Sequence, residues 1–279
     1  MSIRVRDSLT SELGRLRHEP TAKRIRGVLG AATVVDSTRA ALVWEPRRVV
    51  PSYAVPVEDV LGELVPAAPV ATSDSDGIGV PLPDVSRRPV LDPSVPFRVH
   101  TAEGEAVDVE TEGDVRRGAA FRLADPDLAG YVVLDFSAFD GWYEEDEPAL
   151  AHPRDPFHRI DVLASSRHVR VERDGAVLAE SSRPTLLFET MLPTRYYLPR
   201  QDVRVELVPS DRRTSCAYKG QASYWSATIG GQVVRDLAWT YESPSREAAP
   251  VRDLVAFFDE RVDVMLDGTR HERPVTPWS

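Results

Sequence analysis

The residues of this 279-residue chain that could do chemistry are concentrated in one stretch, TSCAYKGQASYW at 214–225. It contains the only cysteine, Cys216, followed closely by Tyr218 and Lys219. The thiolate is the nucleophilic form of cysteine, and a nearby ammonium group favours it over the thiol. We therefore predict Cys216, Lys219 and Tyr218 as catalytic residues. The alternative is that Cys216 is a small buried hydrophobe, as single cysteines often are.

A second set of residues would hold a ligand beside the thiol. The segment RYYLPR at 195–200 combines arginines with tyrosines, and guanidinium groups bind anionic or planar groups well. These aromatic residues would otherwise form only a packing row across neighbouring strands. A carboxylate in the preceding strand would pair with the basic side chains. The predicted ligand-binding residues are Arg195, Tyr196, Tyr197, Arg200, Tyr224, Trp225 and Glu189.

Neither a metal nor a cofactor is predicted. His152 and His158 are spaced in no compact ligand pattern, and one cysteine cannot build a zinc site. The Gly-x-Gly at 77–79 lacks the third glycine of a dinucleotide-binding turn.

The composition indicates a globular protein and restricts its partners. Hydrophobic residues make up 42% of the chain, and the formal net charge of -10 disfavours binding to a phosphate backbone. No apolar stretch is long enough to cross a membrane, and the N-terminus has no apolar run typical of a secretory signal. We expect a cytoplasmic protein with a small-molecule ligand and no nucleic-acid or membrane partner.

The elements that must position these residues are mostly strands. Branched and apolar residues alternate with polar ones over 24–37 and 39–45, and Asp174-Gly175 predicts a tight hairpin within 168–181. Helices are predicted at 8–17, 155–166 and 248–261 from their apolar spacing. Seven prolines between Pro66 and Pro96 predict a long loop outside regular structure, disordered or draped over the surface as a lid.

The two halves of the chain correspond to each other. VVDSTRAALVWE (34–45) aligns with LAESSRPTLLFE (178–189), and YAVPVEDV (53–60) aligns with YYLPRQDV (196–203). We interpret this as a tandem duplication with its boundary near Ser165. The predicted domains are an N-terminal copy at 1–165, a C-terminal copy at 166–270 and a tail at 271–279.

The N-terminal copy is degenerate. Ser52 and Ala54 stand where the C-terminal copy has Arg195 and Tyr197, and nothing in the first half matches the stretch around Cys216. We expect the site in the C-terminal copy and a supporting role for the N-terminal one.

The run ESSRPTLLFET, RYYLPRQDV and SCAYKGQASYW, in this order, resembles the bacterial family known as domain of unknown function 427. The resemblance covers about residues 168–268. It implies a small, mostly antiparallel β domain of the tent-like Mss4 type, with one helix and without metal ligands. We therefore expect a mainly β protein made of two such domains.

The leading functional hypothesis is an enzyme that uses Cys216 on an anionic or carbonyl-containing metabolite. A non-catalytic small-molecule-binding module and a structural scaffold are the alternatives. A solvent-reached thiol beside a cation would favour the enzyme. An open aromatic pocket with a buried thiol would favour the binding module, and a filled interior would favour the scaffold.

Overall fold

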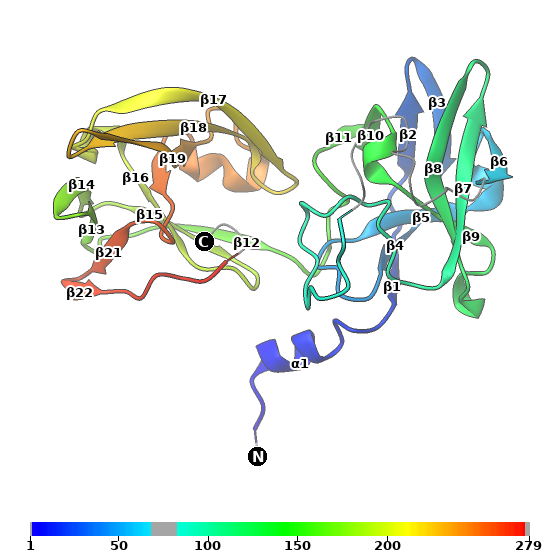
Figure 1. Cartoon of the computed structure of the whole chain (residues 1–279), viewed down its shortest axis with the longest axis horizontal. Coiled ribbons are helices and arrows are strands. Elements are labelled where there is room, and N and C mark those ends of the chain that lie inside the picture. Colours follow the sequence, from blue (N-terminus) through cyan, green and yellow to red (C-terminus); the bar gives the residue numbers. More distant parts are fainter. Residues whose placement is uncertain (1, 68–82, 277–279) are drawn as a thin grey trace. The chain divides into compact units, whose positions relative to one another are not determined.

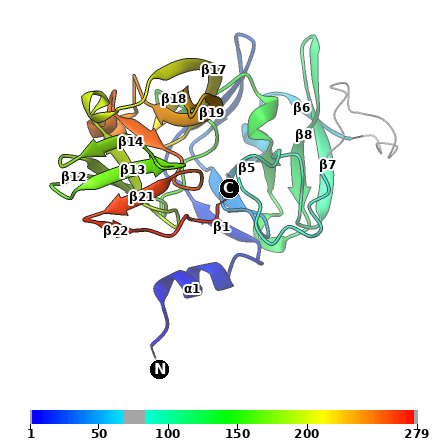
Figure 2. The same ribbon diagram turned by 60° about the vertical axis from the view of Figure 1, so that its left-hand side comes forward.

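Strands dominate the computed structural model, which describes residues 2–67 and 83–276 (Figures 1 and 2). The chain divides into two compact units, residues 1–155 and 156–279, which are described separately below. No helix in the described part of the chain is long and apolar enough to span a membrane.

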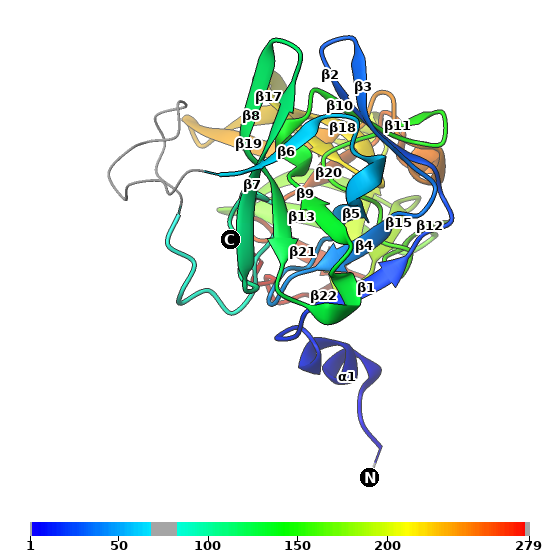
Figure 3. The same cartoon turned by 90° about the vertical axis from the view of Figure 1, so that its right-hand side faces the viewer.

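The N-terminal unit contains two antiparallel sheets (Figure 3). The larger has the order β1 (Arg17–Pro20), β4 (Ala41–Trp44), β5 (Ser52–Pro56), β9 (Tyr131–Leu134), β8 (Asp114–Leu123), β7 (Gly104–Thr111) and β6 (Glu63–Pro66). The smaller has the order β11 (Glu147–Ala149), β10 (Gly141–Glu144), β2 (Ile25–Leu29) and β3 (Ala32–Ser37). Its short helical elements are α1 (Val5–Ser11), η1 (Val57–Asp59), η2 (Pro126–Leu128) and η3 (Phe136–Ala138).

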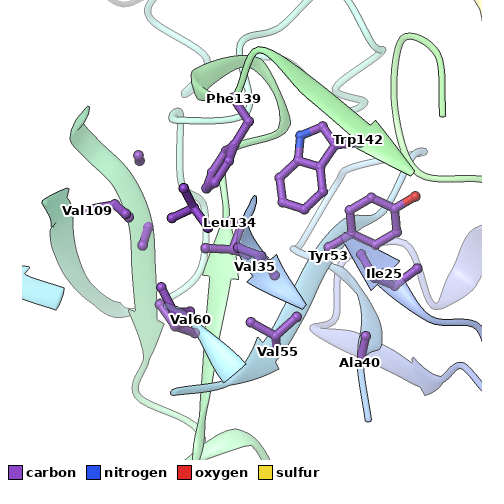
Figure 4. Packing of buried hydrophobic residues seen from close by; sticks show 14 of the residues in the cluster. Ile25, Val35, Ala40, Tyr53, Val55, Val60, Val109, Leu134, Phe139 and Trp142 are labelled. Carbon is purple, nitrogen blue, oxygen red and sulfur yellow. The ribbon is translucent and has the colours of Figure 1, made fainter. Parts of the chain in front are cut away.

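A hydrophobic core holds these two sheets together (Figure 4). Ile25 and Val35 of the smaller sheet pack in one cluster with Val55 and Leu134 of the larger, and all are nearly inaccessible to solvent. Alternation along each strand supplies the apolar face that this core needs, and its burial is the main stabilising contribution. The larger sheet also buries its other face, where Val43 and Ala54 pack in a second cluster.

The C-terminal unit also contains two antiparallel sheets. The larger has the order β12 (Ile160–Ala164), β15 (Thr185–Glu189), β16 (Arg195–Leu198), β20 (Val255–Phe257), β19 (Gln232–Thr240), β18 (Gly220–Ile229) and β17 (Leu207–Cys216). The smaller has the order β14 (Ala176–Ser181), β13 (Val169–Arg173), β21 (Asp263–Leu266) and β22 (Thr269–Arg270). Its helical elements are η4 (Arg200–Asp202) and η5 (Arg246–Val251).

The strand orders of the two units correspond throughout, as a duplication predicts. Ala41 pairs with Ala54 in the first unit, and the aligned residues Thr185 and Tyr197 pair in the second. The two units also share a side-chain hydrogen bond at equivalent positions. Ser37 donates to Asp59 at 2.6 Å, and Ser181 donates to Asp202 at the same distance.

The division between the units falls after Asp155, whereas the alignment placed it near Ser165. Residues 160–164 form β12, which pairs with β15 of the second unit. The helix predicted at 155–166 is therefore wrong. β12 contains the branched residues Ile160 and Val162, which suit an extended strand.

The helix predicted at 248–261 is also wrong. Its first part is the 3-10 helix η5, which contains Pro250, and its middle part is the central strand β20. All three residues of β20 are buried, because this strand lies between two neighbours and has core on both faces. A continuous apolar run of this kind cannot be distinguished from a buried helix by its spacing.

Two other predicted elements differ in extent. The helix predicted at 8–17 is the shorter α1, which buries none of its residues. In the predicted loop at 66–96, Pro66 ends β6, and residues 68–82 lie outside the described part. The described residues 83–96 contain an isolated bridge between Arg48 and Leu91 and no strand.

Candidate functional site

A tight turn between β17 and β18 presents the predicted catalytic residues. β17 ends at Cys216, β18 begins at Gly220, and residues 217–219 form the turn. Gly220 has a φ of 93°, and a Cβ there would lie 3.2 Å from the carbonyl oxygen of Ser243. Glycine is the residue that tolerates both. The Ser245 amide donates to the Lys219 carbonyl at 3.1 Å, so the turn is fastened to the segment before η5.

Lys219 forms a buried ion pair with Glu189, the last residue of β15. The ammonium donates to Oε2 of the carboxylate, while Nε2 of His158 lies 3.1 Å from its Oε1. Burial alone would raise the pKa of Glu189, but hydrogen bonds and charges from His158 and Lys219 lower it to about 2. Glu189 is therefore a carboxylate at neutral pH.

The same arrangement keeps Lys219 protonated. Burial alone would lower the pKa of its ammonium. The charges of Cys216, Glu189 and Tyr197 raise this pKa by more than burial lowers it, so the net shift is upward. Cys216 ends the strand that leads into this turn, three residues before Lys219. Cys216 is half-buried and forms no disulfide.

His158 and Tyr218 complete this group. Their rings stack with centroids 4.5 Å apart, and Tyr218 is buried in the turn. Tyr218 lies in the turn and not on a strand, because β17 ends at Cys216. We call Cys216, Tyr218, Lys219, Glu189 and His158 the Cys216 cluster. His158 was not predicted as a member, and the pairing of Ile160 with Glu189, which brings it close, was hidden by the false helix.

Tyr197 and Tyr224 belong to an aromatic row that is packed. Trp239 donates to the Tyr197 hydroxyl at 3.1 Å, and burial raises the pKa of this phenol to about 12. Tyr224 stacks with Phe258 at 6.2 Å. Ala248 and Val251 of η5 pack in the same cluster, so the row is largely enclosed.

Tyr196 and Trp225 lie on the other face of the sheet. Neighbouring strand residues point to opposite faces, and these two pack in the core cluster with the smaller sheet. The guanidinium of Arg200 lies over the Trp225 ring at 4.2 Å. Tyr197 and Trp225, both predicted as ligand-binding residues, therefore pack in different clusters on opposite faces of the sheet.

Arg195 is already held by carboxylates. It donates two hydrogen bonds to Glu260, at 2.6 and 3.0 Å, and its guanidinium lies 5.6 Å from the centroid of Trp239. Burial lowers the pKa of Arg195, but Glu260 and Asp259 raise it overall. A ligand would have to displace Glu260 to use this group.

The N-terminal unit has a related arrangement without a thiol. Glu45, aligned with Glu189, is buried and lies 2.8 Å from Nδ1 of His100. It also accepts hydrogen bonds from the backbone amides of Thr101 and Ala102, at 2.6 and 3.0 Å. The pairing registers of the two large sheets place Thr101 where Lys219 stands in the second unit. Backbone amides thus replace the ammonium.

The fold and this site define the C-terminal unit as a small two-sheet antiparallel β domain with a cysteine, a lysine and a buried glutamate at one hairpin. Residues 161–268 match the model of the family described as domain of unknown function (DUF427), which confirms the resemblance found in the sequence. No curated protein matches the chain.

Proposed function

We propose that the C-terminal unit is a cysteine-dependent enzyme for an anionic or carbonyl-containing small molecule. The observation that carries the proposal is the half-buried Cys216 beside a protonated Lys219, whose ammonium is fixed by the ionised Glu189. A cation at this position favours the thiolate and also attracts an anionic substrate.

Each member of the Cys216 cluster has a role in this proposal. The thiol of Cys216 releases its proton to solvent, and the thiolate attacks a carbonyl carbon of the substrate. The new carbon–sulfur bond converts the carbonyl oxygen into an oxyanion, whose charge Lys219 stabilises. Glu189 positions the ammonium, His158 restrains Glu189, and Tyr218 packs on His158.

The aromatic row gives less support to the alternative of a binding module. Tyr197, Tyr224 and Trp239 are each less than 10% exposed and contact one another or Phe258, so they offer a ligand little surface. The proposal includes a cytoplasmic location, because a free thiol stays reduced there.

Alkylation kinetics test the activated thiol. Iodoacetamide at pH 7 should label native protein at Cys216 faster than a free cysteine peptide, and one labelled site suffices because the chain has one cysteine. Lys219→Met should slow labelling about tenfold, since it removes the nearby cation. Lys23→Met is the matched control, because Lys23 pairs with Glu144 in the other unit.

Turnover is tested on a panel of small aldehydes, thioesters and keto acids. Cys216→Ser should abolish turnover and leave the melting temperature within about 2 °C. A thiol that is labelled only after denaturation, together with a serine variant that loses stability, would show that Cys216 only packs.

A further inference from the structure

A cavity of about 200 Å³ lies in the C-terminal unit on the Tyr196 side of the large sheet. Its walls include Tyr196, Asp259, Val262 and Val264, and residues 271–274 of the tail line it as well. Figure 2 shows this segment continuing from β22. None of these residues belongs to the Cys216 cluster.

The N-terminal unit fills the corresponding space with aromatic rings. Following the strand pairings, Trp142 is equivalent to Val264, Phe136 to Asp259 and Tyr53 to Tyr196. The ring centroid of Trp142 lies 5.1 Å from that of Tyr53 and 5.8 Å from that of Phe136. Smaller side chains in the second unit leave the space open.

The cavity wall also contains two polar groups that lack close partners. Asp259 Oδ2 lies 3.6 Å from Arg195, beyond hydrogen-bonding distance, while Glu260 takes two hydrogen bonds from that guanidinium. The Tyr196 phenol makes no hydrogen bond to another described residue, whereas the equivalent Tyr53 donates to Glu144 at 2.9 Å. Both groups line the cavity, and a ligand bound there would supply the hydrogen-bond partners that no described residue provides.

We propose that this cavity binds a small organic cation with a compact apolar body. Its ammonium would pair with Asp259 and hydrogen-bond the Tyr196 oxygen, while its apolar part would contact Val262 and Val264.

The charges around the cavity favour a cation over an anion. Arg195 is paired with Glu260, and Arg273 is paired with Asp263 at 2.9 and 3.0 Å. His271 and Glu272 line the cavity from the tail. The positive charge of Arg167 lies farther away and opposes the rise that burial causes in the pKa of Tyr196. Arg270 also pairs with Asp263, at 2.7 Å. The group as a whole keeps a negative balance, because its carboxylates, those of Asp259, Glu260, Asp263 and Glu272, outnumber its three guanidinium groups by one.

Binding should depend on pH because Asp259 titrates near neutrality. Burial raises the pKa of this carboxyl to about 7; Arg195 lowers it and Glu260 raises it further. A cation binds the ionised form, so affinity should be highest above pH 7 and fall as the pH drops below it. His271 also lines the cavity, and an Asp259 variant that keeps His271 separates the contributions of the two residues.

Calorimetry on the full-length protein tests the site with benzylamine, benzyl alcohol and benzoate, which share one ring and differ in charge. At pH 8 benzylamine should bind at least tenfold more tightly than the other two. Asp259→Asn should weaken benzylamine binding about tenfold and remove most of the difference between pH 8 and pH 6. Asp211→Asn, at an exposed position, should change neither.

Val264→Trp is the second variant, because it restores the tryptophan of the N-terminal unit. It should abolish benzylamine binding without lowering the melting temperature. If it fails to fold, Asp259→Asn decides the question. Equal binding of the three probes, no benzylamine binding at pH 8, or full binding by the tryptophan variant would overturn the proposal.

Discussion

Glu45 in the N-terminal unit and Glu189 in the C-terminal unit occupy equivalent positions, yet they are satisfied in different ways. Glu45 accepts hydrogen bonds from two backbone amides and contacts His100. Glu189 contacts His158 and holds an ammonium. Both units retain the buried carboxylate as a structural feature, but in the second unit a cysteine stands three residues before the lysine that pairs with it.

A similar contrast separates the ends of the large sheets. In the C-terminal unit a short turn joins β17 to β18, whereas a long segment precedes β7, the equivalent of β18, in the N-terminal unit. Arg48 fastens this segment by donating to the carbonyls of Pro96 and Val99, at 2.6 Å each. In the C-terminal unit Lys219 occupies the end of a short turn. A long segment held by backbone contacts satisfies the carboxylate without placing a reactive group beside it.

The largest expected effect is the loss of stability on replacing Glu189, compared with the loss on replacing Glu45. Glu189→Gln should lower the free energy of unfolding by about 3 kcal/mol at pH 7, since it leaves Lys219 buried without its counter-charge. Glu189 has a folded-state pKa of about 2, below its ordinary 4.5, so this stability is present above about pH 4.5. The difference from wild type should therefore disappear as the pH falls toward 2.

Glu45→Gln is the matched variant for chemical denaturation followed from pH 2 to 8. It should cost clearly less, because a neutral amide oxygen still accepts from the Thr101 and Ala102 amides. Equal losses in the two variants would contradict the distinction between the sites.

The second prediction concerns Arg48, which is 1% exposed. Arg48→Met should cost about 2 kcal/mol, because it leaves buried backbone carbonyls without donors. Hydrogen exchange should accelerate at residues 95–102 and remain unchanged at 214–225. Faster exchange in both segments would show that the effect is not local.

The third prediction concerns Asp259, whose contribution to stability changes with pH in the opposite direction to that of Glu189. The pKa of Asp259 is raised by burial from 3.8 to about 7, so the folded state favours its protonated form. That stabilisation is present below about pH 4 and is lost as the pH rises through 7. Asp259→Asn should therefore stabilise the protein by about 2 kcal/mol at pH 8 and leave stability unchanged near pH 4. Thermal unfolding at the two pH values measures this, and a destabilised variant at pH 8 would contradict it.

The smallest prediction concerns a feature that the units share. Ser37 and Ser181 are buried, and each donates to an aspartate at 2.6 Å. Ser37→Ala and Ser181→Ala should each cost about 1 kcal/mol, the usual contribution of such a bond. Denaturation curves that differ strongly between the two variants would show that the copies have diverged here as well.

By itself the sequence determined the correspondence between the two halves, most of the strands and the closeness of Cys216 to Lys219. The residue types of a short segment were enough to predict a turn where the backbone must adopt a positive φ. Asp174-Gly175 forms the predicted hairpin with positive φ at both residues, and Gly220 forms the predicted turn. Lys219 and Cys216 are near each other because only two residues separate them along the chain.

The tertiary structure alone decided which distant groups meet. His158 reaches Glu189 because β12 pairs with β15, and β20 is a strand because neighbours on both sides bury it. Tyr196 and Tyr197 differ by one position and lie in different cores. The cavity beside Asp259 likewise depends on strands far apart in the chain. Such pairings come from long-range packing, which the spacing of apolar residues along one segment does not encode.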